Sequence, residues 1–296
     1  MLKPVILVTG ANGQLGKELQ ALSAAWPQFS FVFASREELP VQDKARVRKF
    51  FVENLPAFCV NCAAYTAVDK AESDPDTAFA VNAAAPGILA AACREYNARF
   101  IHISTDYVFD GTSPVPYKED DRTNPVNVYG KTKLKGEQLC MEENPQAIII
   151  RTAWVYSSFG HNFVKTMLRL MKERPMINVV NDQTGAPTSA ADLAQCIMTI
   201  IANAHTSLSN WHPGIYHYSN KGRITWYDFA VAIKELSGSN CQVNPIPTTQ
   251  YPTPAKRPSF SLLDTSKMEA TFGCTIPDWK DSLKQVLKQL KEKADD

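Results

Sequence analysis

Short apolar runs alternate with longer amphipathic runs along the first half of the chain. Each apolar run is of strand length and nearly continuous, which predicts strands buried on both faces. These runs lie at 4–8, 29–34, 57–64, 99–105 and 147–150. Helical runs separate them, at 17–25, 47–54, 74–96 and 132–143. This alternation predicts an α/β fold with a doubly wound parallel sheet.

The alternation loosens after residue 156. We expect helices at 163–172, 189–202, 225–236 and 278–293, a short strand at 214–218, and an irregular proline-rich segment at 245–258. We therefore expect a larger domain over residues 1–156, with 189–204 packing back on it. A smaller mixed α/β domain, made of 157–188 and 205–296, is expected to cover the carboxyl edge of the sheet.

A glycine triplet follows the first strand directly. Gly10, Gly13 and Gly16 have the spacing Gly-x-x-Gly-x-x-Gly and lead into a helix. Such glycines permit a tight turn, let the backbone approach a pyrophosphate, and let the helix pack closely on the strand. The helix N-terminus then offers N–H groups to the phosphates. The pattern predicts a dinucleotide site at Gly10, Gly13, Gln14, Leu15 and Gly16, although a glycine-rich turn without a ligand has the same sequence.

The second strand ends at Ser35 and Arg36, about twenty residues past the glycines. A site for NAD carries Asp or Glu there, to bind the ribose 2′-hydroxyl. Arg36 instead suits the 2′-phosphate of NADP, although Glu37 and Glu38 follow at once and a solvated loop arginine is the alternative. We therefore expect NADPH as the cofactor, with NADH possible.

Tyr129 and Lys133 are four residues apart on the predicted helix, so they share one face. An ammonium near a phenol favours the phenolate, which predicts a lowered pKa for Tyr129 and a role as proton donor. The hydroxyl of Thr105, at the end of the fourth strand, is expected to join them. A Tyr-x-x-x-Lys pattern alone also fits an ordinary amphipathic helix.

Composition excludes several other classes of protein. The formal net charge of +1 gives no reason to expect nucleic-acid or acidic-membrane binding. No apolar run approaches the roughly 20 residues of a membrane helix, so we expect no membrane. We expect a reducing, cytoplasmic location because the cysteines suit small buried thiols. Cys59 and Cys62 form a Cys-x-x-Cys inside a strand-like segment, which favours small buried thiols over a redox or metal pair.

These motifs, in this order and spacing, resemble the dTDP-4-dehydrorhamnose reductase branch of the extended short-chain dehydrogenase/reductase family, which has a Rossmann fold. The stretches that carry the likeness are 66–72, 104–111, 127–133, 151–156 and 181–188. The resemblance implies NAD(P)H-dependent reduction of a nucleotide-linked 4-keto-6-deoxy sugar, giving dTDP-L-rhamnose. It implies Thr105, Tyr129 and Lys133 as catalytic residues, and further cofactor contacts at Ala64, Tyr65 and Thr66.

The resemblance also implies substrate contacts at Thr105, Asp106 and Trp154, and it places the second domain over the sugar nucleotide. Arg257 in the proline-rich segment is a candidate for the pyrophosphate. The alternatives are a solvated loop charge for Arg257, and for Trp154 packing beneath the second domain.

Two positions depart from the family pattern. Pro40 and Val41 stand where the family has an acidic residue followed by Ile or Val beside the adenine, so the expected adenine contact is Val41. Ala190 and Ala191 precede Asp192 where some members hold a bridging magnesium. We therefore expect no metal, and a monomer or weak homodimer.

Two other functions have related sequences. Sugar-nucleotide dehydratases carry a second acid after the Thr-Asp of the fourth strand, and this chain has Tyr107 there. A non-catalytic NADP-binding regulatory subunit of a methionine adenosyltransferase resembles the chain more closely and keeps the Tyr-x-x-x-Lys. NADPH oxidation with the keto-sugar nucleotide would separate the reductase from that subunit.

Overall fold

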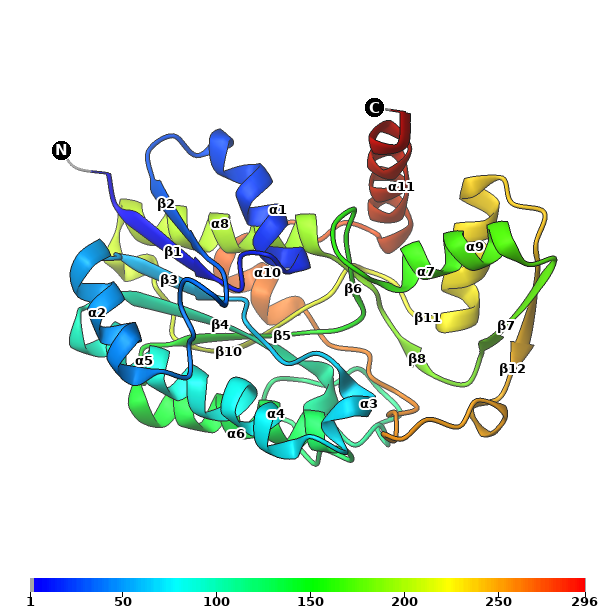
Figure 1. Cartoon of the computed structure of the whole chain (residues 1–296), viewed down its shortest axis with the longest axis horizontal. Helices are drawn as coiled ribbons and strands as arrows, with labels where there is room; N and C mark the ends of the chain where they lie inside the picture. Colours follow the sequence, from blue (N-terminus) through cyan, green and yellow to red (C-terminus); the bar gives the residue numbers. More distant parts are fainter. Residues whose placement is uncertain (1–2, 296) are drawn as a thin grey trace.

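Six parallel strands form the main sheet of the computed structural model, which describes residues 3–295. Their order is β10-β5-β4-β3-β1-β2, and every neighbouring pair is parallel. The predicted parallel α/β sheet is confirmed (Figure 1). The strands are β1 (Val5–Thr9), β2 (Ser30–Ala34), β3 (Phe58–Asn61), β4 (Arg99–Thr105), β5 (Ile148–Thr152) and β10 (Gly214–Tyr218).

Helices cover both faces of this sheet, because successive strand residues point to opposite sides. Ile6 and Val8 of β1 belong to one core cluster, and Leu7 between them belongs to the other. The first face carries α1 (Gln14–Leu22), α8 (Ala190–Thr206) and α10 (Ser266–Phe272). The second face carries α2 (Lys44–Asn54), α5 (Ala85–Glu95) and α6 (Val128–Glu143).

Strand β10 lies in the main sheet, although its sequence range falls within the part expected to form the second domain. It pairs with β5, from Gly214 opposite Ile148 to Tyr218 opposite Thr152. The sequence of this short apolar run does not indicate which strand it pairs with. The pairing follows from the edge of β5 that β4 leaves open. Helix α8 packs on the sheet beside α1, through Leu193, Ile197 and Ile201.

The predicted single helix over 74–96 is interrupted. It divides into α4 (Pro75–Phe79), a π-helical turn (Ala80–Ala84) and α5, after a short α3 (Val68–Ala71). Pro86 lacks an N–H and cannot continue the regular hydrogen-bond ladder, which accounts for the wide turn before it. The segment Pro75–Glu95 is long and apolar enough for a membrane span, contrary to expectation, but 56% of its apolar window is buried against the protein, as in a core helix.

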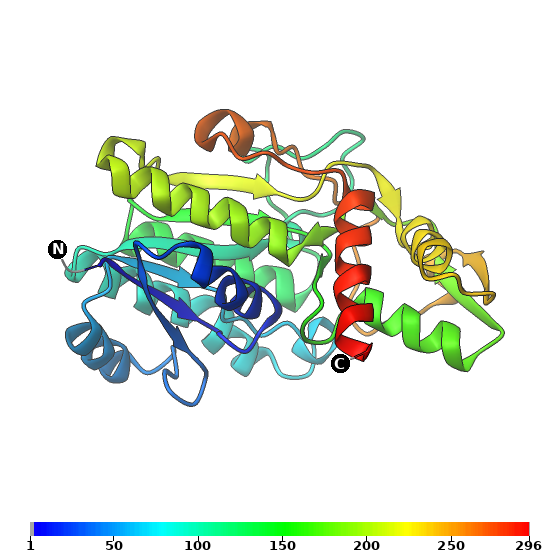
Figure 2. The ribbon, with the colours of Figure 1, turned by 90° about the horizontal axis from the view of Figure 1, so that it is seen from above.

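The second part of the molecule has its own core. It contains α7 (Phe163–Glu173), α9 (Trp226–Ser237) and α11 (Trp279–Asp295), with β7 (Met176–Val180) pairing with β12 (Gln242–Ile246). Short pairs complete it, β6 (Val155–Tyr156) with β9 (Thr188–Ser189) and β8 (Thr184–Gly185) with β11 (Ile224–Thr225). Helix α11 stands between the main sheet and helices α7 and α9 in both views (Figures 1 and 2). The exact domain division stays a prediction.

Four short 3₁₀ turns complete the described elements. They are Ser23–Ala25, Asp106–Val108, Leu208–Asn210 and Thr248–Gln250. The second of these carries Asp106 out of the carboxyl end of β4, so it lies at the same edge of the sheet as the glycine loop.

Candidate functional site

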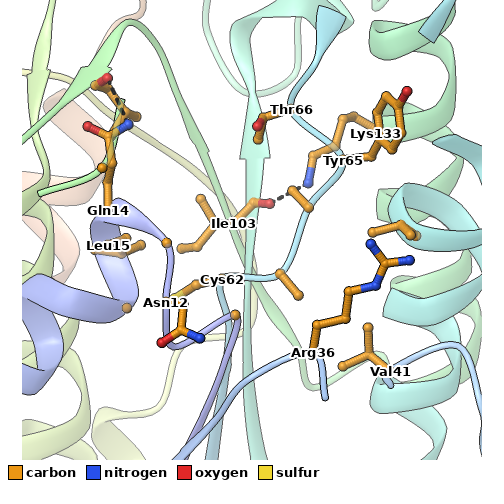
Figure 3. Close-up of a pocket in the computed structure, with 18 of the residues that line it drawn as sticks. Asn12, Gln14, Leu15, Arg36, Val41, Cys62, Tyr65, Thr66, Ile103 and Lys133 are labelled. Carbon is orange, nitrogen blue, oxygen red and sulfur yellow. Dashed lines mark hydrogen bonds between the residues drawn. The ribbon is translucent and has the colours of Figure 1, made fainter. Parts of the chain in front are cut away.

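A cavity of about 830 Å³ lies at the carboxyl edge of the sheet. The strand order reverses there, because β2 lies on one side of β1 and β3 lies on the other. Chain segments leaving these strands diverge, and open α/β sheets bind ligands in the crevice that results. Figure 3 shows Gln14, Arg36, Tyr65 and Lys133 around this cavity.

The glycine loop forms the base of the cavity. Gly10 has φ +66°, and a Cβ built on it would lie 2.6 Å from the Ala63 nitrogen. A Cβ on Gly16 would lie 2.5 Å from the Gly10 oxygen, so neither position accepts a side chain without a shift. Helix α1 begins after Gly13, which caps it with no side chain. This cradle of bare backbone at a helix N-terminus fits a dinucleotide pyrophosphate.

The end of β2 supplies the next group of lining residues. Arg36 and Val41 both line the cavity, and the Arg36 side chain extends past Val41 in Figure 3. Their contacts with a cofactor stay predictions. Ser35 does not line it, and its backbone N–H and its hydroxyl both form hydrogen bonds with Glu38. The contact of Ser35 with a cofactor stays a prediction.

The segment after β3 lines the cavity through Ala64, Tyr65 and Thr66, whose contacts with a cofactor stay predictions. The sequence did not reveal how this segment is held. Asn82, inside the π-helical turn, accepts a hydrogen bond from the Tyr65 nitrogen at 2.8 Å and donates to the Tyr65 oxygen at 3.0 Å. Its amide pairs with the backbone of Tyr65 as a neighbouring strand would. The π-helical turn therefore holds the segment after β3 in place.

Tyr129 and Lys133 both line the cavity from the first turns of α6. The Asn127 side chain starts this helix by accepting from the Gly130 nitrogen at 2.7 Å. The predicted lowering of the Tyr129 pKa is wrong for this structure. Desolvation raises the pKa of Tyr129 to about 12, and contact with the Thr105 hydroxyl offsets only part of that effect. The phenol therefore keeps its proton at neutral pH.

The Lys133 ammonium is hydrogen-bonded to β4 and not to the Tyr129 phenol. Its Nζ donates to the Ile103 carbonyl oxygen at 2.6 Å (Figure 3). The same Nζ lies 3.5 Å from Nε2 of His102. Burial lowers the pKa of Lys133 to about 8, against the opposing effect of Glu137 one turn along the helix. This arrangement explains why Lys133 does not stabilise a Tyr129 phenolate here.

Thr105 and Asp106 do not line the cavity, but they adjoin it at the end of β4. The Thr105 hydroxyl donates to Asp106 Oδ1 at 3.0 Å and accepts from the Tyr107 nitrogen at 3.2 Å. Asp106 is 2% exposed, and desolvation raises its pKa to about 6. Thr105 is thus held beside the Tyr129 hydroxyl by its own neighbours.

Trp154 follows β5 in a left-handed conformation, with φ +48°. Its ring stacks on Trp226 of α9 at 3.7 Å between centroids, and a Cβ on Gly185 would lie 2.9 Å from it. The side chain thus packs beneath the second part of the molecule, one of the two arrangements expected. Its contact with substrate stays a prediction.

Arg257 is partly buried and does not line the main cavity. Its guanidinium binds both carboxylate oxygens of Asp69, in α3, at 2.5 and 2.8 Å. The arginine therefore joins the proline-rich segment to the larger part of the molecule, and its substrate contact stays a prediction.

Several lining residues were not among the predicted site. Among them are Asn12, Leu39, Cys62, Ile103, Gly160 and His161. Asn12 lies within the glycine loop, and this position in the sequence was the one signal that could have indicated that it lines the cavity. Gly160 and His161 come from the loop after β6, which returns over the glycine loop. Asn162 of that loop donates to Gln14 Oε1 at 3.0 Å.

Cys59 and Cys62 face opposite sides of the sheet. Cys59 packs in one core cluster and Cys62 against the other, so they do not form a pair. Across residues 3–295 no three His, Cys, Asp or Glu side chains gather as a metal site. Asp192 instead accepts hydrogen bonds from Asn220 and Ser282.

The sheet, the glycine cradle and the Tyr129–Lys133 helix around one cavity define the class: a Rossmann-type, dinucleotide-binding protein of the extended short-chain dehydrogenase/reductase kind. Comparison with known proteins narrows this. The profile of the RmlD substrate binding domain matches residues 4–292. The dTDP-4-dehydrorhamnose reductase of Sinorhizobium fredii is 43% identical over 286 residues, which are 95% of this chain and 96% of that protein.

Two solved structures are similar over nearly the whole chain. A dTDP-4-dehydrorhamnose reductase from Clostridium acetobutylicum is 43% identical, with a TM-score of 0.91, over 97% of this chain and 99% of that one. The enzyme from Bacillus anthracis, solved with NADP, is 37% identical with a TM-score of 0.91, over 97% and 100%. The chain therefore belongs to the RmlD family of dTDP-4-dehydrorhamnose reductases, which confirms the resemblance inferred from its motifs.

Proposed function

We propose that this protein is an NADPH-dependent dTDP-4-dehydrorhamnose reductase, which reduces the C4 ketone of the sugar nucleotide to give dTDP-L-rhamnose. One observation carries the proposal. The glycine cradle, Arg36 and the Tyr129–Lys133 pair all line a single cavity at the switch point of the sheet. The reductase relatives are full-length matches, and the B. anthracis enzyme holds NADP.

The residues divide the work as follows. Gly10, Gly13 and Gly16 leave room for the pyrophosphate of the cofactor, and Arg36, which lines the same cavity, would bind the 2′-phosphate. Bound NADPH supplies the hydride. Tyr129 carries a proton at neutral pH, because its pKa is about 12, and it gives that proton to the ketone oxygen as negative charge develops there.

Thr105 and Lys133 assist this proton transfer. The Thr105 hydroxyl lies beside the Tyr129 phenol and can orient the substrate carbonyl. Lys133 lines the cavity, and the ammonium protons not used by the Ile103 oxygen would bind the nicotinamide ribose.

One assay tests the proposal. Purified protein is mixed with NADPH and dTDP-4-dehydro-6-deoxy-L-mannose, and the loss of absorbance at the nicotinamide band is followed. We expect consumption that depends on this sugar and is much slower with other nucleotide-linked keto-sugars. No consumption by protein that still binds NADPH would contradict the reductase function. The relatives do not favour a methionine adenosyltransferase subunit, and co-purification with a synthetase would reveal one.

A further inference from the structure

A line of buried polar groups runs beneath the cavity from β1 to Lys133. The Thr9 hydroxyl donates to Asn61 Oδ1 at 2.7 Å, and Asn61 Nδ2 lies 3.0 Å from Nδ1 of His102. Nε2 of His102 in turn lies 3.5 Å from Nζ of Lys133. All four side chains are at most 1% exposed, so water does not compete for these contacts.

A backbone group sets the direction of these hydrogen bonds. The Ala63 N–H can only donate, and it donates to Asn61 Oδ1 at 3.2 Å. Asn61 therefore presents its Nδ2 donor to His102, and Nδ1 of the imidazole must accept. A neutral imidazole carries one N–H, so the proton of His102 lies on Nε2, facing Lys133. Burial, and then the charge of Lys133, lower the pKa of His102 and keep the ring neutral.

Lys133 thus meets a donor, not an acceptor, on its His102 side. Within residues 3–295, the Ile103 oxygen is the acceptor that its ammonium reaches, at 2.6 Å. The other titratable groups that act on it are Glu137 and Cys140 of its own helix and Cys62 at the end of β3. Had His102 carried its proton on Nδ1, Nε2 would accept from the ammonium and draw it away from the cavity.

We infer that Asn61 and His102 are positioning residues, which hold the His102 ring in its Nε2–H form and so keep the Lys133 ammonium protons available to the cavity. The inference rests on the proposed function only where it assigns Lys133 a role in binding the cofactor. Its structural part, the tautomer, concerns this chain alone and needs no cofactor.

The first test measures the tautomer in the ligand-free chain. Long-range ¹H–¹⁵N spectra of the five histidine rings report which nitrogen is protonated, and His102→Phe identifies the His102 signals. We expect His102 as the Nε2–H form between about pH 6 and about pH 9. His217 is an internal control, because its Nδ1 lies 3.1 Å from the Tyr117 carbonyl oxygen and must donate, giving the opposite form. An Nδ1–H form of His102 would overturn the inference.

The second test reverses the hydrogen bond. In Asn61→Asp the side chain can only accept from His102, so the ring should change to the Nδ1–H form and capture Lys133. We expect NADPH to bind about tenfold more weakly in fluorescence titrations, the effect of one charge-assisted contact. Asn61→Leu, which has no donor, serves in its place if the aspartate variant does not fold. Unchanged affinity with a reversed tautomer would reject the inference.

A double variant separates the tautomer from the added charge. His102→Phe removes the acceptor and keeps a flat ring, which suits the stacked contact with Phe100. In Asn61→Asp with His102→Phe, we expect NADPH affinity within about twofold of that of His102→Phe alone. A loss that persists in the double variant would show that the introduced carboxylate acts directly, and the inference would fail. Wild-type protein that binds no NADPH would instead contradict the proposed function, whatever the tautomer.

Discussion

Arg257 and Asp69 form a two-point ion pair that ties the proline-rich segment to α3. Nη1 and Nη2 of Arg257 lie 2.5 and 2.8 Å from the two carboxylate oxygens, and this contact lowers the pKa of Asp69. The same guanidinium donates to the Ala255 oxygen. A pyrophosphate contact by Arg257 would therefore be made by a group that is already held in place.

Arg257→Ala is expected to raise the KM for the sugar nucleotide and leave NADPH affinity unchanged, because such a contact is made equally in the ground and transition states. Steady-state kinetics and NADPH titration measure the two effects. Asp69→Asn is the matched control, since it breaks the ion pair and keeps the arginine. If both variants lose thermal stability alike with KM unchanged, Arg257 has a structural role.

Tyr129→Phe is expected to lower turnover by about 10²-fold or more, because it removes the proton donor, while NADPH binding stays largely intact. Tyr107→Phe is the control, because its ring meets that of Tyr129 edge-on at 5.6 Å and the change removes a hydroxyl from the same aromatic pair. Single-turnover kinetics with both variants give the comparison. Near-normal turnover in Tyr129→Phe would refute its assignment as the acid.

Arg36→Ala is expected to weaken NADPH binding more than NADH binding, by the roughly 1.5–3 kcal/mol of a charge-assisted contact to the 2′-phosphate. Titrations with both cofactors measure the difference. Arg46→Ala, an exposed position of α2 outside the cavity, should affect neither cofactor. Equal losses for both cofactors in Arg36→Ala would mean that Arg36 does not recognise the 2′-phosphate.

Asp106 should make folding stability depend on pH. Desolvation raises its pKa from 3.8 to about 6 in the folded protein, so between these values the folded state binds more protons than the unfolded state. The protonated carboxyl contributes at most about 3 kcal/mol to the free energy of unfolding. This contribution is complete below about pH 4 and is lost as the pH rises through about 6. Urea unfolding at about pH 4 and about pH 7 measures the free energy of unfolding of wild type and of Asp106→Asn. Relative to wild type, the variant should be more stable at the higher pH than at the lower one. An equal difference at both values would refute the shift.

Much of the fold and cavity could be predicted because the signals are local. The buried strands read as apolar runs, and the glycine triplet lies between a strand and a helix, so backbone geometry and ligand chemistry coincide in a few residues. Gly10, Arg36 and Tyr129 reached one cavity because parallel strands end at one edge of the sheet.

Contacts between distant segments could not be predicted in this way. The Asn82 amide holds Tyr65, Arg257 pairs with Asp69, and Lys133 turns to the Ile103 oxygen. Each depends on a partner that tertiary packing supplies. The prediction of a lowered Tyr129 pKa was wrong for the same reason. Tyr129 and Lys133 do lie one helical turn apart, but desolvation and the direction of the Lys133 side chain decide whether the pKa rises or falls.

The place of β10 in the sheet has a consequence for synthesis of the protein. The core that contains the first strand, through Ile6 and Val8, also contains Tyr216, Met268 and Ile276. A ribosome releases the N-terminal end first, so the nascent chain must keep β5 as an open edge, and one sheet face partly bare, until nearly the whole protein has emerged. Such long-range closure slows folding. We therefore expect this protein to complete its fold only late in translation, and to be vulnerable to premature edge-to-edge association until then.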